Sequence, residues 1–420
     1  MAERPNFRAP RGTRDILPPE SDRRRALVDA FADEAARAGY GEIVSPIFEE
    51  IGVFLRVGEQ TEIVTKEMYD FHDRDDRHMA LRPELTASVV RAFVQERPTL
   101  PWKVWYEGPQ FRYEKPQAGR YRQFSQVGIE MLGTDDPAAD VEVIALADRF
   151  WNRLGLRGVR LGVNSLGDEQ SRPRYLAALC AHFESHAADL SEQSRETLVR
   201  NPLRVLDSKR PEDAGVIAAA PVMVDHLDGE TAEHFAAVTA GLDALGIDHE
   251  ISPRLVRGLD YYTRTTFEFA ADSLDAAQNA VGGGGRYDRL AEEMGGPATP
   301  GIGFALGVDR ILLACDAEGA FAAPPPSVTV FVVDATDGTA ATALCDELRR
   351  AGIGADRAFD GRSMKAQMKV ADRSGARYAA IIGDDELAAG TVTLRPLRAD
   401  EDQVAVPRGT MVDEIRKRLL

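Results

Sequence analysis

The sequence of 420 residues has few cysteines, and the three it has, Cys180, Cys315 and Cys345, are far apart. Without CxxC spacing they indicate neither a disulfide framework nor a zinc motif, so we expect reduced thiols and a cytoplasmic protein. No apolar run approaches the roughly 18 residues that a membrane-spanning helix needs. The N-terminal segment MAERPNFRAPRGTRD also lacks the apolar stretch of a secretory signal, so neither membrane insertion nor secretion is expected.

Basic residues are also in short supply, because 51 Lys and Arg stand against 68 Asp and Glu, a formal net charge of −17. Such acidity opposes association with nucleic acid through long-range repulsion. The imbalance is uneven: 14 of the basic and 15 of the acidic residues lie from Ser327 onward, which leaves −16 on the preceding part. The tail is therefore nearly neutral, and a local basic run within it is compatible with an RNA contact.

One stretch, residues 106–133, concentrates cations between two runs that favour β-strands. The runs predict an antiparallel pair joined by a loop longer than a tight hairpin, residues 112–122. This loop carries Arg112, Lys115, Arg120 and Arg122 beside planar and hydrogen-bonding side chains. Guanidinium groups with such neighbours suit a site for phosphates and a base, although an arginine-rich surface hairpin would show the same pattern.

The loop sequence FRYEKPQAGRYRQF, residues 111–124, resembles motif 2 of the class II aminoacyl-tRNA synthetases in the form of the histidyl family. The resemblance implies that Arg112 binds the α-phosphate of ATP, that Glu114 also contacts ATP, and that Phe124 stacks on the adenine. It implies that Gln117 and Arg122 reach the acceptor end of the tRNA, where such side chains can hydrogen-bond a base. The chain departs from the family at residue 125, where serine replaces a frequent histidine.

A long amphipathic segment, residues 21–38, predicts a helix with Ser21 as its N-cap and Gly39 as its stop. Residues 42–48 then predict a strand that contains Pro46. Because proline donates no backbone hydrogen bond, this strand either lies at a sheet edge or meets another chain. The helix and strand together resemble motif 1 of the same enzymes, which implies a homodimer.

The run LRPELTA, residues 81–87, leads into a predicted helix at residues 88–96, where Thr86 either caps the helix or faces a substrate. In the second strand of the hairpin, Gln126 and Glu130 are four residues apart and therefore on one face. The resemblance implies that Glu84, Thr86, Gln126 and Glu130 surround the substrate histidine. Its ammonium group needs buried acceptors.

The run LVRGLDYY, residues 255–262, resembles the segment that separates the histidyl enzymes from other class II enzymes. It implies that Arg257 stabilises charge during the reaction and that Tyr261 and Tyr262 contact histidine. A second family segment, GGGGRYD at residues 282–288, places Tyr287 with them.

A glycine-rich run at residues 301–310, GIGFALGVDR, resembles motif 3. The resemblance implies that Arg310 stacks on the adenine from the side opposite the phenylalanine of motif 2, as a planar guanidinium permits. The acidic residue before it is usually glutamate, and here it is Asp309.

Residues 168–250 change to a helical, alanine-rich and acidic composition, which predicts a helical insertion. Within it NPLRVLDSK, residues 201–209, resembles a stretch of the bacterial histidyl enzymes. Cys180, His182 and His186 suggest a metal site as an alternative. Because neither a fourth ligand nor an HExxH glutamate is nearby, we assign no protein side chain as a metal ligand.

After a proline-rich linker, strands alternate with helices to the end of the chain, which predicts a small α/β domain with a mixed sheet. GRSMKAQMKVAD, residues 361–372, resembles the family's anticodon-binding domain. A basic stripe there suits RNA phosphates, although a solvated helix face would show the same spacing. We define this basic stripe as Arg362, Lys365, Lys369, Arg373 and Arg377.

The predicted fold is an α+β catalytic domain with an antiparallel sheet of the class II synthetase type, a helical insertion and a C-terminal α/β anticodon-binding domain. The expected bounds are 1–167 and 251–320 for the catalytic domain, 168–250 for the insertion, 321–327 for the linker and 328–420 for the anticodon-binding domain. The resemblance implies a histidine–tRNA ligase that activates L-histidine with ATP and Mg²⁺ and transfers it to tRNA(His).

Two other functions remain open on sequence alone. The regulatory subunit of ATP phosphoribosyltransferase is similar to the histidyl catalytic domain without aminoacylating, but Arg112, Arg257, Arg310 and the C-terminal domain disfavour it. A class II enzyme for another amino acid, such as proline or threonine, is disfavoured by LVRGLDYY. The seven histidines all lie outside these motifs, so histidine-based acid–base catalysis is not expected.

Overall fold

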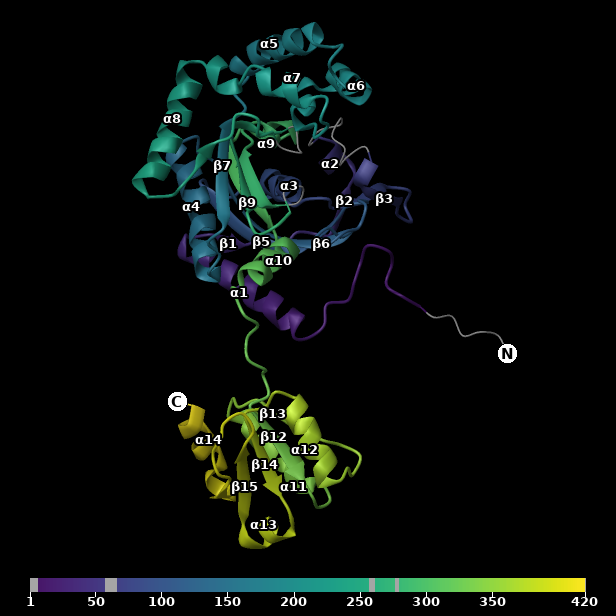
Figure 1. The fold of residues 1–420 in the computed structure, drawn as a ribbon, viewed down its shortest axis with the longest axis vertical. Coiled ribbons are helices and arrows are strands. Elements are labelled where there is room, and N and C mark those ends of the chain that lie inside the picture. Colours follow the sequence, from purple (N-terminus) through teal and green to yellow (C-terminus); the bar gives the residue numbers. More distant parts are fainter. Residues whose placement is uncertain (1–6, 57–65, 257–260, 276–278, 420) are drawn as a thin grey trace, which may run out of the picture. The chain divides into compact units, whose positions relative to one another are not determined.

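The structure, a computed structural model, describes residues 7–56, 66–256, 261–275 and 279–419. The chain forms two units, Met1–Ala322 and Ala323–Leu420 (Figure 1). Among the described residues, every helix is too short or too polar to cross a membrane.

The first unit is built on one large sheet of eight strands. They are β1 (Gly41–Glu42), β5 (Trp102–Phe111), β6 (Gln123–Leu132), β7 (Val159–Ser165), β8 (Glu250–Ile251), β9 (Thr263–Ala271), β10 (Ala280–Arg286) and β11 (Gly301–Gly307). The order is β1-β5-β6-β11-β10-β9-β7-β8. The six inner strands run antiparallel, while the two-residue edge strands pair in parallel. The predicted hairpin of β5 and β6 is confirmed.

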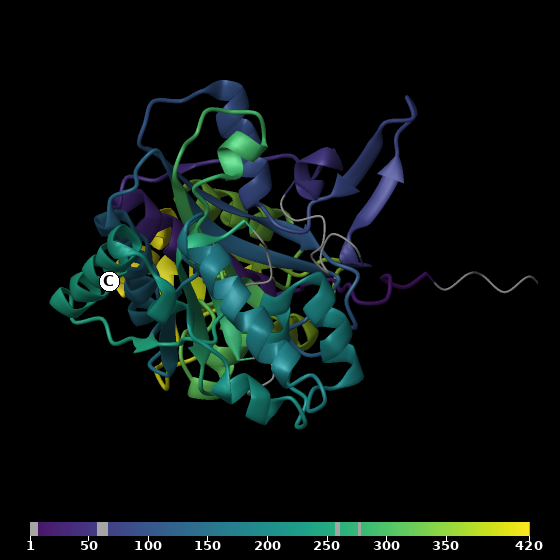
Figure 2. The ribbon, with the colours of Figure 1, turned by 90° about the horizontal axis from the view of Figure 1, so that it is seen from above.

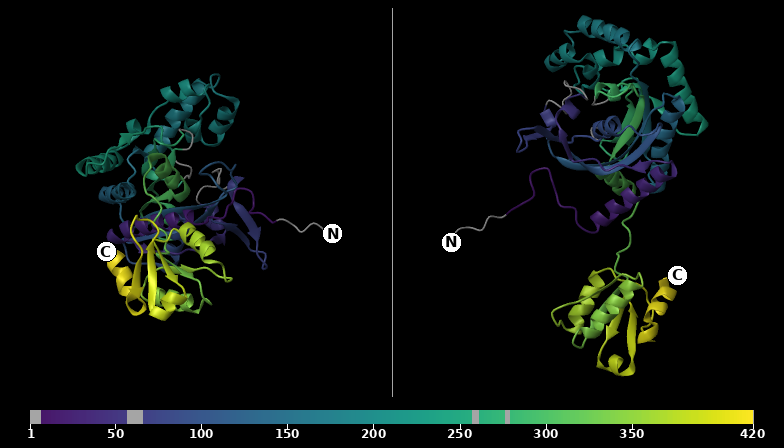
Figure 3. Two further views of the ribbon diagram at one scale, coloured as in Figure 1. Left: turned by 60° about the horizontal axis from the view of Figure 1, so that its bottom comes forward. Right: turned by 180° about the vertical axis from the view of Figure 1, so that it is seen from behind.

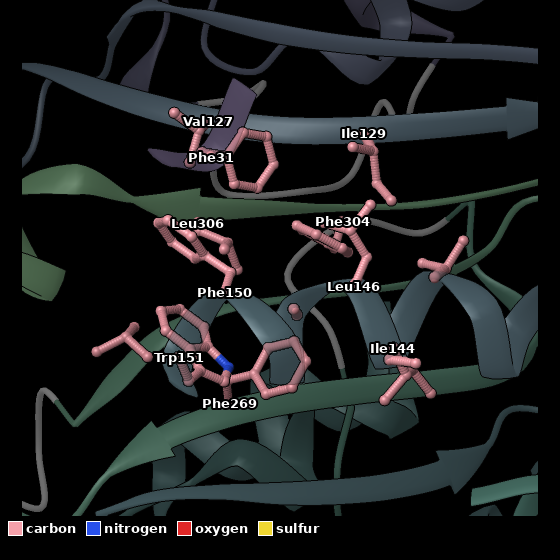
Figure 4. Packing of buried hydrophobic residues seen from close by; sticks show 14 of the residues in the cluster. Phe31, Val127, Ile129, Ile144, Leu146, Phe150, Trp151, Phe269, Phe304 and Leu306 are labelled. Carbon is pink, nitrogen blue, oxygen red and sulfur yellow. The ribbon is translucent and has the colours of Figure 1, made fainter. Parts of the chain in front are cut away.

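One face of this sheet is covered by α1 (Glu20–Arg37), α4 (Pro137–Leu154) and α10 (Val308–Glu318), which share its main core. Phe31 of α1 packs against Phe150 and Phe304, with ring centroids 5.2 and 6.1 Å apart (Figure 4). Val127 and Ile129 of β6 belong to the same core. Because strand side chains alternate, the even-numbered residues of β6 are left for the opposite face.

The opposite face carries α3 (Thr86–Glu96) and α9 (Leu290–Glu293), which contact each other. Beside them lie α2 (Gly52–Leu55) and a small sheet of order β2-β4-β3, comprising β2 (Phe48–Glu50), β4 (His78–Leu81) and β3 (Tyr69–His72).

Two local predictions near the N-terminus are wrong. The strand predicted at residues 42–48 is interrupted between β1 and β2, because Pro46 cannot donate to a ladder and the carbonyls of Ser45 and Pro46 accept from Arg82 Nη1 at 2.9 and 3.2 Å. Helix α1 begins one residue before Ser21, and its N-cap residue is Pro19.

Residues 168–250 form several helices, most of which lie together at one end of the first unit, while the last packs against α4 (Figures 1 and 2). They are α5 (Ser171–Ser185), α6 (Glu192–Arg200), α7 (Ala214–Ala219) and α8 (Gly229–Ala244), with 3₁₀ turns η2 (Pro202–Asp207) and η3 (Met223–His226). Tyr175, Leu179 and Phe183 of α5 are in a core cluster separate from that of the sheet. His182, weighed above as a metal ligand, instead hydrogen-bonds the Val216 carbonyl through Nε2 at 2.9 Å.

The second unit confirms the predicted mixed sheet with helices on both faces (Figure 3). Its strands are β12 (Val330–Asp334), β13 (Ala355–Arg357), β14 (Tyr378–Ile382), β15 (Thr391–Pro396) and β16 (Val404–Pro407). Helices α11 (Thr339–Arg350) and α14 (Met411–Leu419) share one core with Val330 and Val332, and α12 (Met364–Arg373) shares another with Phe331 and Val333. Two short elements, α13 (Asp384–Ala389) and η4 (Arg408–Thr410), were not predicted.

Candidate active site

A cavity of about 410 Å³ brings most of the predicted site residues together. It is enclosed by strands β6, β9, β10 and β11, the loop of residues 112–122, and the first turns of α3 and α10. The predicted residues that line it are Glu84, Thr86, Arg112, Glu114, Phe124, Gln126, Tyr261, Tyr262, Tyr287 and Arg310.

Small residues in β6 and β11 make room for the polar side chains on this face of the sheet. A side chain at Gly303 would overlap the carboxylate of Glu130, and one at Gly301 would overlap the ring of Tyr287. The glycines of the GIGFALG run therefore permit a close approach that any Cβ would prevent.

Glu130 is fully buried just beneath the cavity and accepts three hydrogen bonds. Thr86 Oγ1 donates to its Oε1 at 2.7 Å, Tyr106 OH donates to the same oxygen at 3.1 Å, and Tyr287 OH donates to Oε2 at 2.6 Å. Thr86 is thus a partner of Glu130 and not a cap, because α3 begins at Thr86 and its N-cap position is Leu85. The sequence did not reveal Tyr106, which fits beneath the bare backbone of Gly128.

Beside this network, Glu84 and Gln126 present acceptors to the cavity. Glu84 is buried and accepts from the backbone N–H of Ala87 at 2.9 Å, and burial raises the pKa of its carboxyl. In the described part of the chain, Oε1 of Gln126 is buried without a hydrogen-bond partner. A buried acceptor that lacks a hydrogen-bond partner suits a ligand that carries N–H donors.

The buried carboxyl of Glu130 should make the unliganded protein less stable as pH rises. Burial raises its pKa to about 8, although the hydroxyls of Tyr287 and Thr86 act to lower it. Above the pKa of an unfolded glutamate, about 4.3, the folded protein keeps a proton that the unfolded chain releases. Stability from this group is therefore present at low pH and lost as pH rises towards about 8.

We expect the free energy of unfolding, measured in urea from pH 5 to 8, to fall more steeply for the wild type than for Glu130→Gln. The difference in slope is bounded by about 1.4 kcal/mol per pH unit. Exposed Glu50 provides the matched control, since Glu50→Gln should follow the wild type. Equal slopes in the wild type and Glu130→Gln would contradict a proton held on Glu130.

Two arginines that line the same cavity are held in fixed positions. Arg112 Nε donates to the Pro83 carbonyl at 2.9 Å, and its guanidinium carbon lies 5.3 Å from the ring centroid of Phe124. Arg310 donates to the carbonyls of Ala280 and Gly119, at 2.7 and 3.3 Å. These anchors leave guanidinium groups at the cavity wall, where they can meet a phosphate or stack on a base.

Glu114 lines the cavity and forms an ion pair within its own loop. Both of its carboxylate oxygens accept from Arg120, one of them from Nη2 at 2.9 Å. Gln117 and Arg122 lie outside the cavity lining. Gln117 is exposed, and Arg122 stacks on Tyr113 with its guanidinium carbon 3.6 Å from the ring centroid.

Arg257, the predicted charge-stabilising residue, lies outside the described residues. Two residues that the sequence did not single out also line the cavity: Glu268 of β9 and Arg204 of η2. Glu268 could have been found from the sequence. It lies between the apolar Phe267 and Phe269 in a predicted strand, so its side chain is on the opposite face from theirs. Arg204 stands in the NPLRVLDSK run between the buried Leu203 and Val205.

Comparisons with known proteins agree with this geometry. A family model described as histidyl-tRNA synthetase matches residues 12–311, and one described as an anticodon-binding domain matches residues 327–418. Histidine–tRNA ligase of Nocardia farcinica is 49% identical, with 100% of both chains covered, and that of Mycobacterium marinum is 49% identical, with 98% of this chain and 99% of the relative covered. The apo structure of S. aureus histidyl-tRNA synthetase matches with a TM-score of 0.82 at 36% identity, covering 98% of this chain and 100% of that one.

Proposed function

The chain belongs to the histidyl-tRNA synthetase family and is a histidine–tRNA ligase acting on ATP, L-histidine and tRNA(His), and we propose that its cavity binds histidine at one end and ATP at the other. The observation that carries this division is the separation of groups within one cavity. Buried acidic groups and tyrosines gather around the start of α3, Arg112 is anchored next to them on the Pro83 carbonyl, and Arg310 is anchored on Gly119 of the loop and on Ala280. Buried acidic groups suit an ammonium group, and guanidinium groups suit a triphosphate.

At the histidine end, Glu84 and Thr86 receive the substrate's ammonium group in this proposal. Gln126, Glu130 and the tyrosines Tyr261, Tyr262 and Tyr287 surround the remainder of the amino acid. Glu130 acts from beneath, since its three hydroxyl donors fix the position of its carboxyl group. A side chain held in this way needs no reorganisation when the ligand enters.

At the ATP end, Arg112 binds the α-phosphate, and Phe124 and Arg310 enclose the adenine. Glu114 supports the same site through its ion pair with Arg120. The carboxylate of histidine attacks the α-phosphorus, and pyrophosphate leaves. Negative charge then accumulates next to a guanidinium that is already oriented, which favours the transition state without covalent participation by the protein.

Arg257 is proposed as the second cationic group at the α-phosphate, on the strength of its LVRGLDYY context. Its neighbours on the described chain, Val256 and Tyr261, both line the cavity. A planar guanidinium there would hold the histidine carboxylate and the α-phosphate together.

We further propose that ATP binds together with Mg²⁺, which would supply positive charge that offsets the charge of the phosphates. Among the described residues no group of three or more His, Cys, Asp or Glu side chains could hold a metal ion, and both carboxylate oxygens of Glu114 pair with Arg120, so the phosphates would be the ion's main ligands. A cytoplasmic location is proposed from the scattered cysteines.

The domain bounds are proposed from the order of the elements. The position of α5 to α8 between β7 and β8 supports an insertion at residues 168–250, and the unit Ala323–Leu420 supports a separate anticodon-binding domain after residue 327.

A homodimer is proposed from an apolar surface around the interrupted strand. Val44 is 85% exposed, and Ile47, Phe48 and Phe71 are also exposed, with the rings of Phe48 and Phe71 6.1 Å apart. Several exposed apolar side chains on neighbouring segments are typical of a protein–protein interface. Sedimentation equilibrium at micromolar concentration should give twice the mass of the chain, and a fully active monomer would contradict the proposal.

The basic stripe of the second unit should carry affinity for the anticodon side of the tRNA. All five of its side chains are exposed on or beside α12. Replacing Arg362, Lys365 and Lys369 by alanine in the full chain should lower kcat/KM for tRNA about tenfold or more, while histidine-dependent pyrophosphate exchange keeps its rate. The slope of log(kcat/KM) against log[salt] should become shallower by about 2, the share of three phosphate contacts to single-stranded RNA.

Arg395 offers a control for this triple variant, because it is exposed on β15 of the same unit and lies outside the stripe. Arg395→Ala should retain aminoacylation. Unchanged tRNA kinetics in the triple variant, or an equal loss of pyrophosphate exchange, would reject the assignment of the stripe.

A further inference from the structure

The segment before α1 reaches across the chain to the loop of residues 112–122. The carbonyl of Gly12 accepts a hydrogen bond from the backbone N–H of Arg122 at 2.7 Å. Gly12 has φ of +85°, and a Cβ there would lie 2.7 Å from Arg122 Cγ and 2.9 Å from Pro116 Cγ. Glycine is therefore required both by the backbone conformation and by the closeness of the loop.

Two residues further on, Arg14 contacts both the loop and the start of α10. Its Nη2 donates to Asp309 Oδ1 at 2.9 Å, and its guanidinium carbon lies 4.8 Å from the ring centroid of Tyr121. Its Nη1 donates to Glu20 Oε2 at 2.9 Å, which ties the same group to the first turn of α1. We call Gly12 and Arg14, with these contacts, the N-terminal clasp.

The clasp lies directly behind the ATP end of the cavity. Tyr121 and Asp309 both line that cavity, and Asp309 precedes Arg310. A second cavity, of about 530 Å³, is lined by Arg14 on one side and shares Phe124, Ser125 and Asp309 with the first. The ion pair of Arg14 and Asp309 is thus part of the wall that separates the two cavities.

Resting on the ATP-binding roles proposed for Arg112, Phe124 and Arg310, we infer that Arg14 is a positioning residue for ATP. It holds the loop that carries Arg112 and the helix that carries Arg310 in one fixed relation. Asp309 is 8% exposed and the Arg14 side chain is 31% exposed, so the carboxylate side of the pair is shielded from solvent and the guanidinium side is partly open to it. A loop fixed before binding avoids the entropy cost of being ordered by the ligand.

From the contacts of the clasp we expect the loss of Arg14 to raise the KM for ATP and to leave the KM for histidine unchanged. Among the described contacts of Gly12 and Arg14, none involves Glu84, Thr86 or Glu130 at the histidine end. Arg14→Ala removes the side chain that contacts both α10 and the loop and leaves the hydrogen bond from Arg310 Nε to the Gly119 carbonyl, 3.3 Å long, so the two halves of the adenine site are held less firmly. Loss of a residue that only stabilised the fold would change the KM values for both substrates alike.

The experiment is histidine-dependent pyrophosphate exchange by the full chain, with KM measured separately for ATP and for histidine. Arg14→Ala should raise KM for ATP about tenfold, which corresponds to about 1.4 kcal/mol, and leave KM for histidine unchanged. Arg14→Lys should recover part of the loss, because an ammonium can pair with Asp309 but lacks the planar fork that also reaches Glu20. Tyr121→Leu, which keeps the ion pair, should raise KM for ATP by a smaller factor.

Arg8 supplies the matched control, because it is exposed in the same N-terminal segment, and Arg8→Ala should behave as the wild type. Arg310→Ala in the same assay separates the two proposals. If Arg310→Ala raises KM for ATP and Arg14→Ala does not, the clasp inference is overturned and the ATP site stands. If neither variant changes it, both fall. An equal rise in both KM values for Arg14→Ala, or a change only in melting temperature, also overturns the positioning role.

Discussion

Replacing Arg112 by alanine should lower the single-turnover rate of histidyl-adenylate formation by about 10²- to 10³-fold, the usual loss for a preorganised donor. The guanidinium is fixed from two sides, by the Pro83 carbonyl at 2.9 Å and by the ring of Phe124 at 5.3 Å. It therefore meets the developing charge on the α-phosphate without moving. Its loss removes an interaction that strengthens in the transition state, so the rate should fall more than the affinity for ATP.

Three comparisons make this result specific. Arg112→Lys should recover only part of the rate, because an ammonium is a point charge without a bidentate fork. Arg157→Ala, at an exposed turn between α4 and β7, should keep the wild-type rate. Arg257→Ala should lose adenylation in the same way as Arg112→Ala. A normal rate for Arg112→Ala, or a loss that only follows a lower melting temperature, would contradict the assignment.

Glu84→Gln should lower kcat/KM for histidine by about 10²- to 10³-fold, within the range for truncating a buried, hydrogen-bonded charge pair. Glutamine keeps the shape and the acceptor for the Ala87 N–H, 2.9 Å away, but it loses the charge. The substrate's ammonium would then be desolvated beside a neutral amide, which costs far more than the lost hydrogen bond alone. The KM for ATP should change less than that for histidine, since Glu84 carries no proposed ATP contact, although Arg112 is anchored on the neighbouring Pro83.

A histidine analogue without its α-amino group isolates this interaction. As a competitive inhibitor, 3-(imidazol-4-yl)propionate should bind the wild type and Glu84→Gln with similar affinity, because it carries no ammonium for Glu84 to receive. If the variant weakens the analogue as much as it weakens histidine, Glu84 supports the pocket in general and does not recognise the amino group.

The sequence predicted those parts of the site that depend on local pattern. The alternation of side chains put Gln126 and Glu130 on one face of a strand, and the structure places them on the face that carries the cavity. The basic loop between two β-rich runs likewise predicted the β5–β6 hairpin. Both depend on periodicity and turn residues within about thirty positions of the chain.

The remainder depends on partners that are distant in sequence. Neither the position of Tyr106 beneath Gly128 nor the contact of Gly12 with Arg122 has a local pattern, because each is decided by how strands and loops pack. The role of Thr86 was open for the same reason, since a threonine before a helix is compatible with a cap until its partner, Glu130, is seen. The interruption of the strand at Pro46 could not be predicted locally either. It depends on Arg82, whose guanidinium donates hydrogen bonds to the carbonyls of Ser45 and Pro46.

The most direct test of the central claim, that this cavity activates histidine with ATP, is pyrophosphate exchange by the full chain with each of the twenty amino acids in turn. Exchange should occur with histidine and stay at background with the other nineteen, and it should fall sharply in Glu84→Gln. Exchange supported equally by another amino acid, or no exchange with histidine by folded protein, would contradict the account.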